Sequence, residues 1–292
     1  MAKYIYKGIK DFDLDHIFDC GQCFRWTRQD DGSYTGIAFG RVVNMQVSSA
    51  EDGVHQLEID GCCEEDFNNI WYDYLDMARD YGAVKDILAE GDPVMAKAIE
   101  TGTGIRILRQ DLWETIVSFI ISQNNNIPRI KGCIENLCRL FGEKAGEYGG
   151  TEYYNIPSPE VMASLTADDL APVRLGYRAP YLIETARQVL AKGGMETVSA
   201  ELAAAATPDE ACDYLRQFQG VGPKVASCIA LFGLARLDAF PIDVWVRRVM
   251  NRLYAIDEKD VKAMSAYARE NFGENGGIAQ QYLFYYIRGL DE

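Results

Sequence analysis

Residues 207–224 read TPDEACDYLRQFQGVGPK, and this stretch decides the fold. Thr207, Pro208 and Glu210 combine a helix N-cap, a first-turn proline and a capping-box glutamate. The pattern predicts a helix that ends near Phe218. The glycine turn 219–222 follows, and Pro223 begins a second helix. The sequence therefore predicts two helices joined by a glycine-rich hairpin at about residues 207–233.

Such a hairpin is typical of proteins that bind the DNA backbone. The absence of side chains at Gly220 and Gly222, which flank Val221, lets backbone N–H groups approach a phosphate closely. The N-terminus of the second helix adds positive potential. A Gly-x-Gly turn between helices also occurs in unrelated proteins, so the motif alone indicates phosphate binding without sequence recognition.

Lys224 and Asp243 add chemistry to the hairpin. Lys224 lies in the first turn of the second helix, where the helix dipole disfavours a cation, and this suits a nucleophilic amine. Cys228 follows four residues later on the same helix face. Residues 240–245, FPIDVW, place Asp243 where another helix begins. Singly, the two residues also fit an ordinary surface lysine and a capping aspartate.

The regions that flank the hairpin differ in secondary-structure pattern. Residues 1–105 are predicted to be a β-rich module, because three Asp-Gly pairs have the spacing of hairpin turns and residues 43–48 alternate apolar and polar side chains. Residues 66–75 are predicted to be helical. Residues 106–292 are predicted to be a helical body, with helix starts at Asp111 and Pro128 and a helix end at Gly142. The fold class is α+β, an antiparallel sheet module on a mostly α-helical body.

The net charge of the whole chain disfavours binding to nucleic acid, since the 292 residues carry a charge of −15. The excess is concentrated in residues 1–103, whose net charge is −11, whereas residues 104–252 carry −1. The hairpin therefore lies in a nearly neutral region that can hold a local basic surface. We expect weak non-specific affinity for DNA.

Composition excludes several classes of protein. No apolar run approaches the roughly 20 residues of a membrane span, and Asp11, Asp13 and Asp15 do not fit a signal peptide, so we expect a cytoplasmic protein. The eight cysteines are expected to be free thiols. Cys20 and Cys23 have CxxC spacing, but no second pair or nearby histidine completes a zinc site. No cluster of four cysteines is present for iron–sulfur binding.

The spacing of Lys224 and Asp243 resembles that of the helix-hairpin-helix DNA glycosylases, whose motif ends in a Gly/Pro-rich loop and an aspartate. A lysine at this position marks the bifunctional glycosylase/lyase branch of that superfamily. Four further segments resemble 8-oxoguanine DNA glycosylase in matching order along nearly the whole chain: 21–26 (GQCFRW), 124–129 (NNNIPR), 175–179 (LGYRA) and 279–284 (AQQYLF).

The resemblance implies a base-excision repair enzyme that flips an oxidised guanine out of the duplex. Lys224 attacks C1′ and forms a Schiff base that permits β-elimination, and Asp243 stabilises the cationic sugar. The Gly21 carbonyl accepts a hydrogen bond from N7–H, which normal guanine lacks, and Gln280 binds the Watson–Crick edge. Phe284 and Cys228 sandwich the base, and Phe232 lines the same pocket.

The resemblance also assigns residues to the DNA that is left behind. Asn124 fills the vacated stack, Tyr177 wedges beside the estranged base, and Arg129 and Arg178 bind the orphaned cytosine. No cofactor is required, but family members hold a structural cation on hairpin carbonyls, which here come from Arg216, Phe218 and Val221. The partner is double-stranded DNA, and we expect a monomer.

Two positions depart from the family pattern. Trp245 stands where eukaryotic relatives carry a histidine, and Pro128 precedes Arg129 where a small residue is common. Three alternatives remain: an oxidised-pyrimidine glycosylase of the same superfamily, a non-catalytic hairpin protein that only binds DNA, and a cysteine-based redox or metal protein. Gly21, Gln280 and Phe284 favour the oxidised purine.

Overall fold

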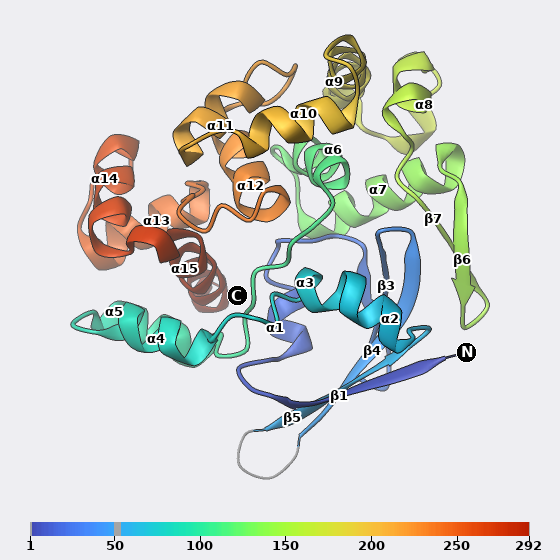
Figure 1. Ribbon diagram of the computed structural model, residues 1–292. Helices are drawn as coiled ribbons and strands as arrows, with labels where there is room; N and C mark the ends of the chain where they lie inside the picture. Colours follow the sequence, from blue (N-terminus) through green and yellow to red (C-terminus); the bar gives the residue numbers. More distant parts are fainter. Residues whose placement is uncertain (1, 50–53, 292) are drawn as a thin grey trace. The chain divides into compact units, whose positions relative to one another are not determined.

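A computed structural model describes residues 2–49 and 54–291 (Figure 1). The chain forms two compact units, each assembled from separate stretches of sequence. The first unit comprises residues 23–45 and 110–234, and the second comprises residues 2–22, 46–109 and 235–292. The boundary predicted at residue 105 stays a prediction.

The β-rich module predicted at the N-terminal end is a five-stranded antiparallel sheet. Its strand order is β1-β5-β4-β3-β2. Val43 and Met45 are buried on β4, as the alternating pattern predicts, but Asn44 between them is buried as well and Val47 is only half-buried. The Asp31-Gly32 turn between β2 and β3 is confirmed, with Gly32 at a φ of +83°. The strands are β1 (Lys3–Ile9), β2 (Trp26–Arg28), β3 (Tyr34–Ala38), β4 (Arg41–Ser49) and β5 (His55–Asp60).

The other two Asp-Gly pairs do not give described hairpin turns. The Asp60-Gly61 prediction is wrong, because β5 ends at Asp60 and the chain continues into a helix that Cys63 caps. An Asp-Gly pair marks a chain reversal but does not specify which element follows. Asp52-Gly53 lies outside the described residues. The predicted helix at 66–75 is confirmed as α2 (Glu64–Asp66), a π-helical turn η2 (Phe67–Trp71) and α3 (Tyr72–Tyr74).

The first hundred residues hold more helix than predicted. Besides α1 (Leu14–Phe18), they contain α4 (Tyr81–Ala89) and α5 (Pro93–Thr101). Asp80 and Asp92 cap these helices by accepting hydrogen bonds from the backbone N–H of Ala83 and Met95. Conversely, the helical body contains a hairpin that the sequence did not predict, formed by β6 (Lys144–Tyr148) and β7 (Thr151–Tyr154). Gly149 and Gly150 both have positive φ in its turn, which suits a two-residue hairpin loop.

The predicted helix boundaries of the body are confirmed where a local cap sets them. Asp111 accepts a hydrogen bond from Glu114 N–H, Thr207 accepts one from Glu210 N–H, and Gly142 ends its helix. In the first unit the helices are α6 (Leu112–Ser122), α7 (Ile127–Phe141), α8 (Pro159–Ser164), α9 (Ala179–Ala191), α10 (Met195–Ala203), α11 (Pro208–Leu215) and α12 (Pro223–Gly233). The helices of the body that belong to the second unit are α13 (Val244–Tyr254), α14 (Val261–Asn271) and α15 (Gly276–Asp291).

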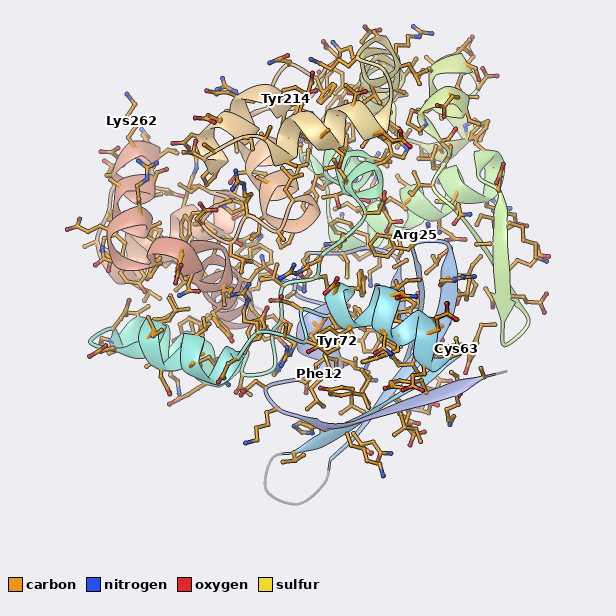
Figure 2. The ribbon with its side chains drawn as sticks, in the orientation of Figure 1. Phe12, Arg25, Cys63, Tyr72, Tyr214 and Lys262 are labelled. Carbon is orange, nitrogen blue, oxygen red and sulfur yellow. The ribbon has the colours of Figure 1, made fainter. Side chains whose placement is uncertain are left out.

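The core of the first unit contains a partly buried ion pair. Arg25, labelled in Figure 2, lies 3.6 Å from Glu114, and their side chains are 3% and 18% exposed. Arg25 also donates a hydrogen bond to the Tyr154 carbonyl. Burial raises the pKa of Glu114 to about 7, although the charge of Arg25 opposes this shift.

Glu114 is expected to make the fold less stable as the pH rises. Its folded pKa is above the unfolded value of about 4.5, so between about pH 4.5 and 7 the folded protein holds a proton that the unfolded chain has lost. Urea denaturation should therefore show a lower free energy of unfolding at pH 8 than at pH 5. Glu114→Gln should remove about 2 kcal/mol of that difference. Glu135→Gln, which replaces an exposed carboxylate on α7, is the control. Equal pH dependence in all three proteins contradicts the expectation.

Candidate DNA interface and base-excision site

The glycine hairpin connects α11 to α12 in the first unit. Its turn is closed by a hydrogen bond of 3.1 Å from Val221 N–H to the Phe218 carbonyl. Gly220 has a φ of +80°, a conformation that residues with a side chain rarely adopt. A Cβ at this position would also lie 2.6 Å from the ring of Tyr181. Glycine is therefore required at position 220 by both conformation and space.

Helix α9 supports the hairpin along one face. The Thr185 hydroxyl donates to the Gln219 carbonyl at 2.8 Å, and Gln188 Oε1 accepts from Gln219 N–H at 2.8 Å. Together with Tyr181, these residues recur at helical spacing, so α9 presents them all to the same turn. The hairpin backbone is thus fixed before any ligand arrives.

The start of α12 suits an anion. Gly222 is its N-cap and supplies no side-chain hydrogen bond to the first turn. Pro223 follows at the first helical position, where its missing N–H costs nothing. The remaining N–H groups of the turn are therefore not capped by a side chain, and the helix dipole adds positive potential. A DNA phosphate fits this chemistry.

Lys224 projects from the first turn of α12 onto an aromatic cluster. Its Nζ lies 5.4 Å from the ring centroid of Phe119, in cation–π range. Phe119 stacks on Phe232 at 5.4 Å and 12°, and meets Phe24 edge-on at 5.8 Å. The three rings cover one side of the Lys224 amine and give it an apolar environment on that side. Sequence reasoning did not single out Phe119, which looked like an ordinary helix core residue.

Two predicted base-binding residues lie on the same helix as Lys224. Cys228 is 4% exposed and Phe232 is 2% exposed. Cys228 lies one turn from Lys224, within reach of a ligand that the amine also contacts. The Phe232 ring stacks on the Phe119 ring and so is part of the same aromatic cluster. Base contact by either residue stays a prediction.

The residues predicted to contact the opposite strand meet at the turn between α6 and α7. Asn124 is exposed and has a φ of +46°. Tyr177 is 49% exposed, and its hydroxyl donates to the Gln123 carbonyl at 3.2 Å. Arg129 is exposed and donates to Asn125 Oδ1 at 3.3 Å and to the Arg174 carbonyl at 3.1 Å. The structure thus brings Asn124, Tyr177 and Arg129 around one loop.

Arg178 belongs to the same cluster but is buried, with 3% exposure. Its guanidinium donates to the backbone carbonyls of Gln123, Asn124 and Leu175 and stacks over the Tyr177 ring at 4.4 Å. This burial and these bonds exclude a solvated surface position for Arg178. Its contact with an orphaned cytosine stays a prediction.

Gln123 links this loop to the hairpin, and no sequence motif marks this role. Its Nε2 donates to the Gly220 carbonyl at 2.9 Å, while its own carbonyl accepts from Arg178 Nε at 2.9 Å. The glycine turn and the loop that carries Asn124 are therefore held in one hydrogen-bonded arrangement.

In the second unit, Asp243 is the N-cap of α13. Its Oδ1 accepts a hydrogen bond of 2.8 Å from Val246 N–H, which fixes the orientation of the carboxylate. Trp245, the position that departs from the family pattern, lies beneath the guanidinium of Arg248 at 4.7 Å. The predicted helix start at Asp243 is confirmed, and its catalytic role stays a prediction.

Gln280 and Phe284 lie one turn apart on α15, as their spacing predicts. Gln280 is 4% exposed, and its Oε1 accepts a hydrogen bond of 2.8 Å from Gln281 Nε2, which orients the amide. Phe284 is half-buried, with the guanidinium of Arg288 5.7 Å from its ring. Gly21 is half-buried and has a φ of +81°. These are the predicted base-reading residues of this unit.

The side chains do not favour a cysteine-based redox site or a metal site. Cys20 and Cys23 are buried and form no disulfide bond, and burial raises the pKa of Cys20 to about 12. Within residues 2–49 and 54–291, no three His, Cys, Asp or Glu side chains gather as a metal site. The predicted cation site uses backbone carbonyls instead. One of these, on Phe218, already accepts a hydrogen bond from Val221 N–H but retains a second lone pair.

Comparison with known proteins agrees with this geometry. Residues 4–116 match the N-terminal domain of 8-oxoguanine DNA glycosylase. Residues 117–274, which include the hairpin, Lys224 and Asp243, match the HhH-GPD superfamily of base excision DNA repair proteins. The chain belongs to the 8-oxoguanine DNA glycosylase family of this HhH-GPD superfamily.

Several relatives match this family member over most of its length. The protein in the structure of MBOgg1 with a low-affinity DNA ligand is 44% identical in sequence to this chain. The match covers 100% of this chain and 97% of the MBOgg1 chain, with a TM-score of 0.92. The Clostridium acetobutylicum 8-oxoguanine glycosylase/lyase, bound to duplex DNA with cytosine opposite 8-oxoguanine, is 40% identical over 100% and 99% of the chains, with a TM-score of 0.89. The Saccharomyces cerevisiae N-glycosylase/DNA lyase is 31% identical over 83% of this chain and 68% of its own.

No helix among the described residues of this glycosylase family member combines the length and apolar character that a membrane span needs.

Proposed function

We propose that this chain is a bifunctional DNA glycosylase that excises 8-oxoguanine from duplex DNA, preferably opposite cytosine, and cleaves the strand by β-elimination. The observation that carries the proposal is Lys224, which emerges beside a rigid phosphate-binding hairpin and rests on an aromatic cluster. The relatives named as 8-oxoguanine glycosylase/lyase support it.

The hairpin and the Asn124 loop act first, on the DNA backbone and the base stack. N–H groups at the start of α12 bind a phosphate, which positions the duplex without reading its sequence. Asn124 fills the space that the flipped nucleotide leaves, and Tyr177 wedges beside the unpaired base. Flipping is necessary because C1′ and the base edge are not accessible inside the duplex.

Base selection depends chiefly on residues of the second unit. The Gly21 carbonyl accepts a hydrogen bond from N7–H of the oxidised base, whereas N7 of guanine is itself an acceptor and repels that carbonyl. Gln280, whose amide is oriented by Gln281, binds the Watson–Crick edge. Phe284 and Cys228 pack on the two faces of the base.

Chemistry begins with the neutral amine of Lys224. Its lone pair attacks C1′ while the bond from C1′ to N9 breaks, and the departing base leaves with the bond electrons and takes up a proton. The carboxylate of Asp243 stabilises the positive charge that develops on the sugar. Ring opening gives a protonated Schiff base, which acidifies the C2′ proton. Loss of that proton expels the 3′ phosphate, and water then releases Lys224.

Opposite-base preference tests the proposed function directly. With 8-oxoguanine placed opposite each of the four bases, we expect single-turnover base release to be fastest opposite cytosine, by about tenfold or more. Arg129→Ala should reduce that preference, because it removes an exposed guanidinium at the Asn124 loop. Arg139→Ala, an exposed arginine on the same helix, is the control. Equal release rates opposite all four bases would refute the cytosine preference.

The same substrates discriminate the alternatives. Release of an oxidised pyrimidine but not of 8-oxoguanine would favour the oxidised-pyrimidine glycosylase. Binding of the duplex without base release or imine formation on either lesion would favour a non-catalytic hairpin protein. We further propose that the enzyme needs no cofactor, acts as a monomer and works in the cytoplasm, on nucleoid DNA if the source is bacterial.

A further inference from the structure

Gln22, the residue after Gly21, is fully buried, and its side-chain amide bridges two backbone segments. Its Nε2 donates to the Ile17 carbonyl at 2.8 Å and to the Arg106 carbonyl at 2.7 Å. Its Oε1 accepts from Leu108 N–H at 2.9 Å. A buried amide with both donors and its oxygen engaged is strongly restricted in position, because each broken bond would leave a buried polar group unpaired.

Two of these bonds dock Gln22 against an extended segment, residues 105–109. The amide bonds the carbonyl of Arg106 and the N–H of Leu108, two positions apart, as a neighbouring β-strand would do. The third bond reaches the end of α1, which leads into the loop that carries Gly21. Gln22 therefore joins the loop to a second part of the same unit.

The extended segment is itself fixed by buried polar groups. Tyr81 accepts a hydrogen bond from Ile107 N–H at 2.8 Å and donates to Asp76, which is 3% exposed. Arg109 donates to the other carboxylate oxygen of Asp76 at 2.8 Å. Gln22 is thus anchored to a rigid support rather than to a mobile loop.

Arg106 strengthens the same support. It is 4% exposed, and its guanidinium donates to the carbonyls of Lys10, Asp11 and Asp76 at 2.9 to 3.0 Å. It also lies over the rings of Tyr81 and Phe12, at 4.6 and 5.6 Å; Phe12 is labelled in Figure 2.

On its other side, the Gly21 turn is held through Asp19. Arg288 of α15 donates to the Asp19 carbonyl at 3.2 Å, and the same guanidinium lies 5.7 Å from the Phe284 ring. Gly21 adopts its φ of +81° between this contact and the buried amide of Gln22. The chain is therefore tied to the protein by hydrogen bonds on both sides of Gly21, at Asp19 and at Gln22.

We propose that Gln22 is the positioning residue that holds the Gly21 carbonyl where it can distinguish N7–H of an oxidised purine from N7 of guanine. This inference rests on the proposed function. Gln22 is buried and acts through the backbone of Gly21. Hydrogen-bond strength falls steeply with distance and angle, so a small shift of this carbonyl weakens selection of the oxidised base. The same shift leaves the cleavage of an abasic site unaffected, because that substrate has no nucleobase for Gly21 to bind.

The test compares two substrates in the full-length enzyme. One is a duplex with 8-oxoguanine opposite cytosine, and the other carries a preformed abasic site, which has no base for Gly21 to read. Gln22→Met keeps the size of the side chain and removes its hydrogen bonds. We expect single-turnover release of 8-oxoguanine to fall about tenfold or more, and cleavage of the abasic site to stay within about twofold of wild type.

Asn44→Leu is the matched control, because Asn44 is also a buried amide and donates to Ser33 and Thr35. It should not change the ratio of the two rates. Tyr81→Phe removes a hydroxyl from the support and should lower the same ratio by a smaller factor, which keeps the test available if Gln22→Met does not fold. An unchanged ratio in both Gln22→Met and Tyr81→Phe overturns the inference. Wild-type enzyme that releases no 8-oxoguanine would instead refute the proposed function.

Discussion

Lys224→Gln is expected to abolish the covalent complex that borohydride traps between the wild-type protein and a duplex with 8-oxoguanine opposite cytosine. Glutamine is a polar but shorter side chain, and the lone pair of its amide nitrogen is delocalised, so no bond to C1′ forms. Base release should fall by at least about a thousandfold. Binding of the duplex should persist, because the hairpin backbone that we propose to bind a phosphate is untouched.

Lys192→Gln is the matched control for this experiment. Lys192 is also a lysine whose amine lies over an aromatic ring, 4.6 Å from Tyr214, but it is the C-cap of α9 and lies outside the hairpin. The control should form as much trapped complex as wild type. A trapped complex that survives Lys224→Gln would show that another amine is the nucleophile.

The parts of the fold that the sequence predicted are those that local chemistry determines. Thr207, Pro223 and Asp243 each start a helix through their own backbone or capping preferences, and the structure has helices beginning there. The same signals were present at Asp80 and Asp92 before α4 and α5, but the Asp-Gly pairs between residues 31 and 61 favoured strands for the whole N-terminal part of the chain. Those helices were missed because two local signals competed.

The parts that could not be predicted depend on contacts distant in sequence. Gln22 bonds Arg106 and Leu108, and Gln123 bonds Gly220, across separations of more than 80 residues. An amide carries no sequence mark that identifies its partner, since it donates and accepts equally well with backbone or water. The resemblance to a family could name Gly21 and Asn124, but not the residues that hold them.

The charge of Asp243, rather than its capping role, is expected to be essential for base release. Asparagine is as good an N-cap as aspartate, so Asp243→Asn should keep the bond from Val246 N–H and leave the thermal unfolding temperature nearly unchanged. It removes the negative charge that stabilises the developing cation on the sugar. Release of 8-oxoguanine should therefore fall by about a hundredfold or more in single-turnover assays.

Two further variants separate charge from capping at Asp243. Asp243→Ala loses both, so it should match the asparagine variant in activity and lose about 1 kcal/mol in stability besides. Asp260→Asn makes the same exchange at the N-cap of α14, which accepts from Ala263 N–H at 2.9 Å, and should retain wild-type activity. If Asp243→Asn were fully active while Asp243→Ala were both unstable and inactive, the carboxylate would be a structural cap, and the positive sugar would have to be stabilised by another group.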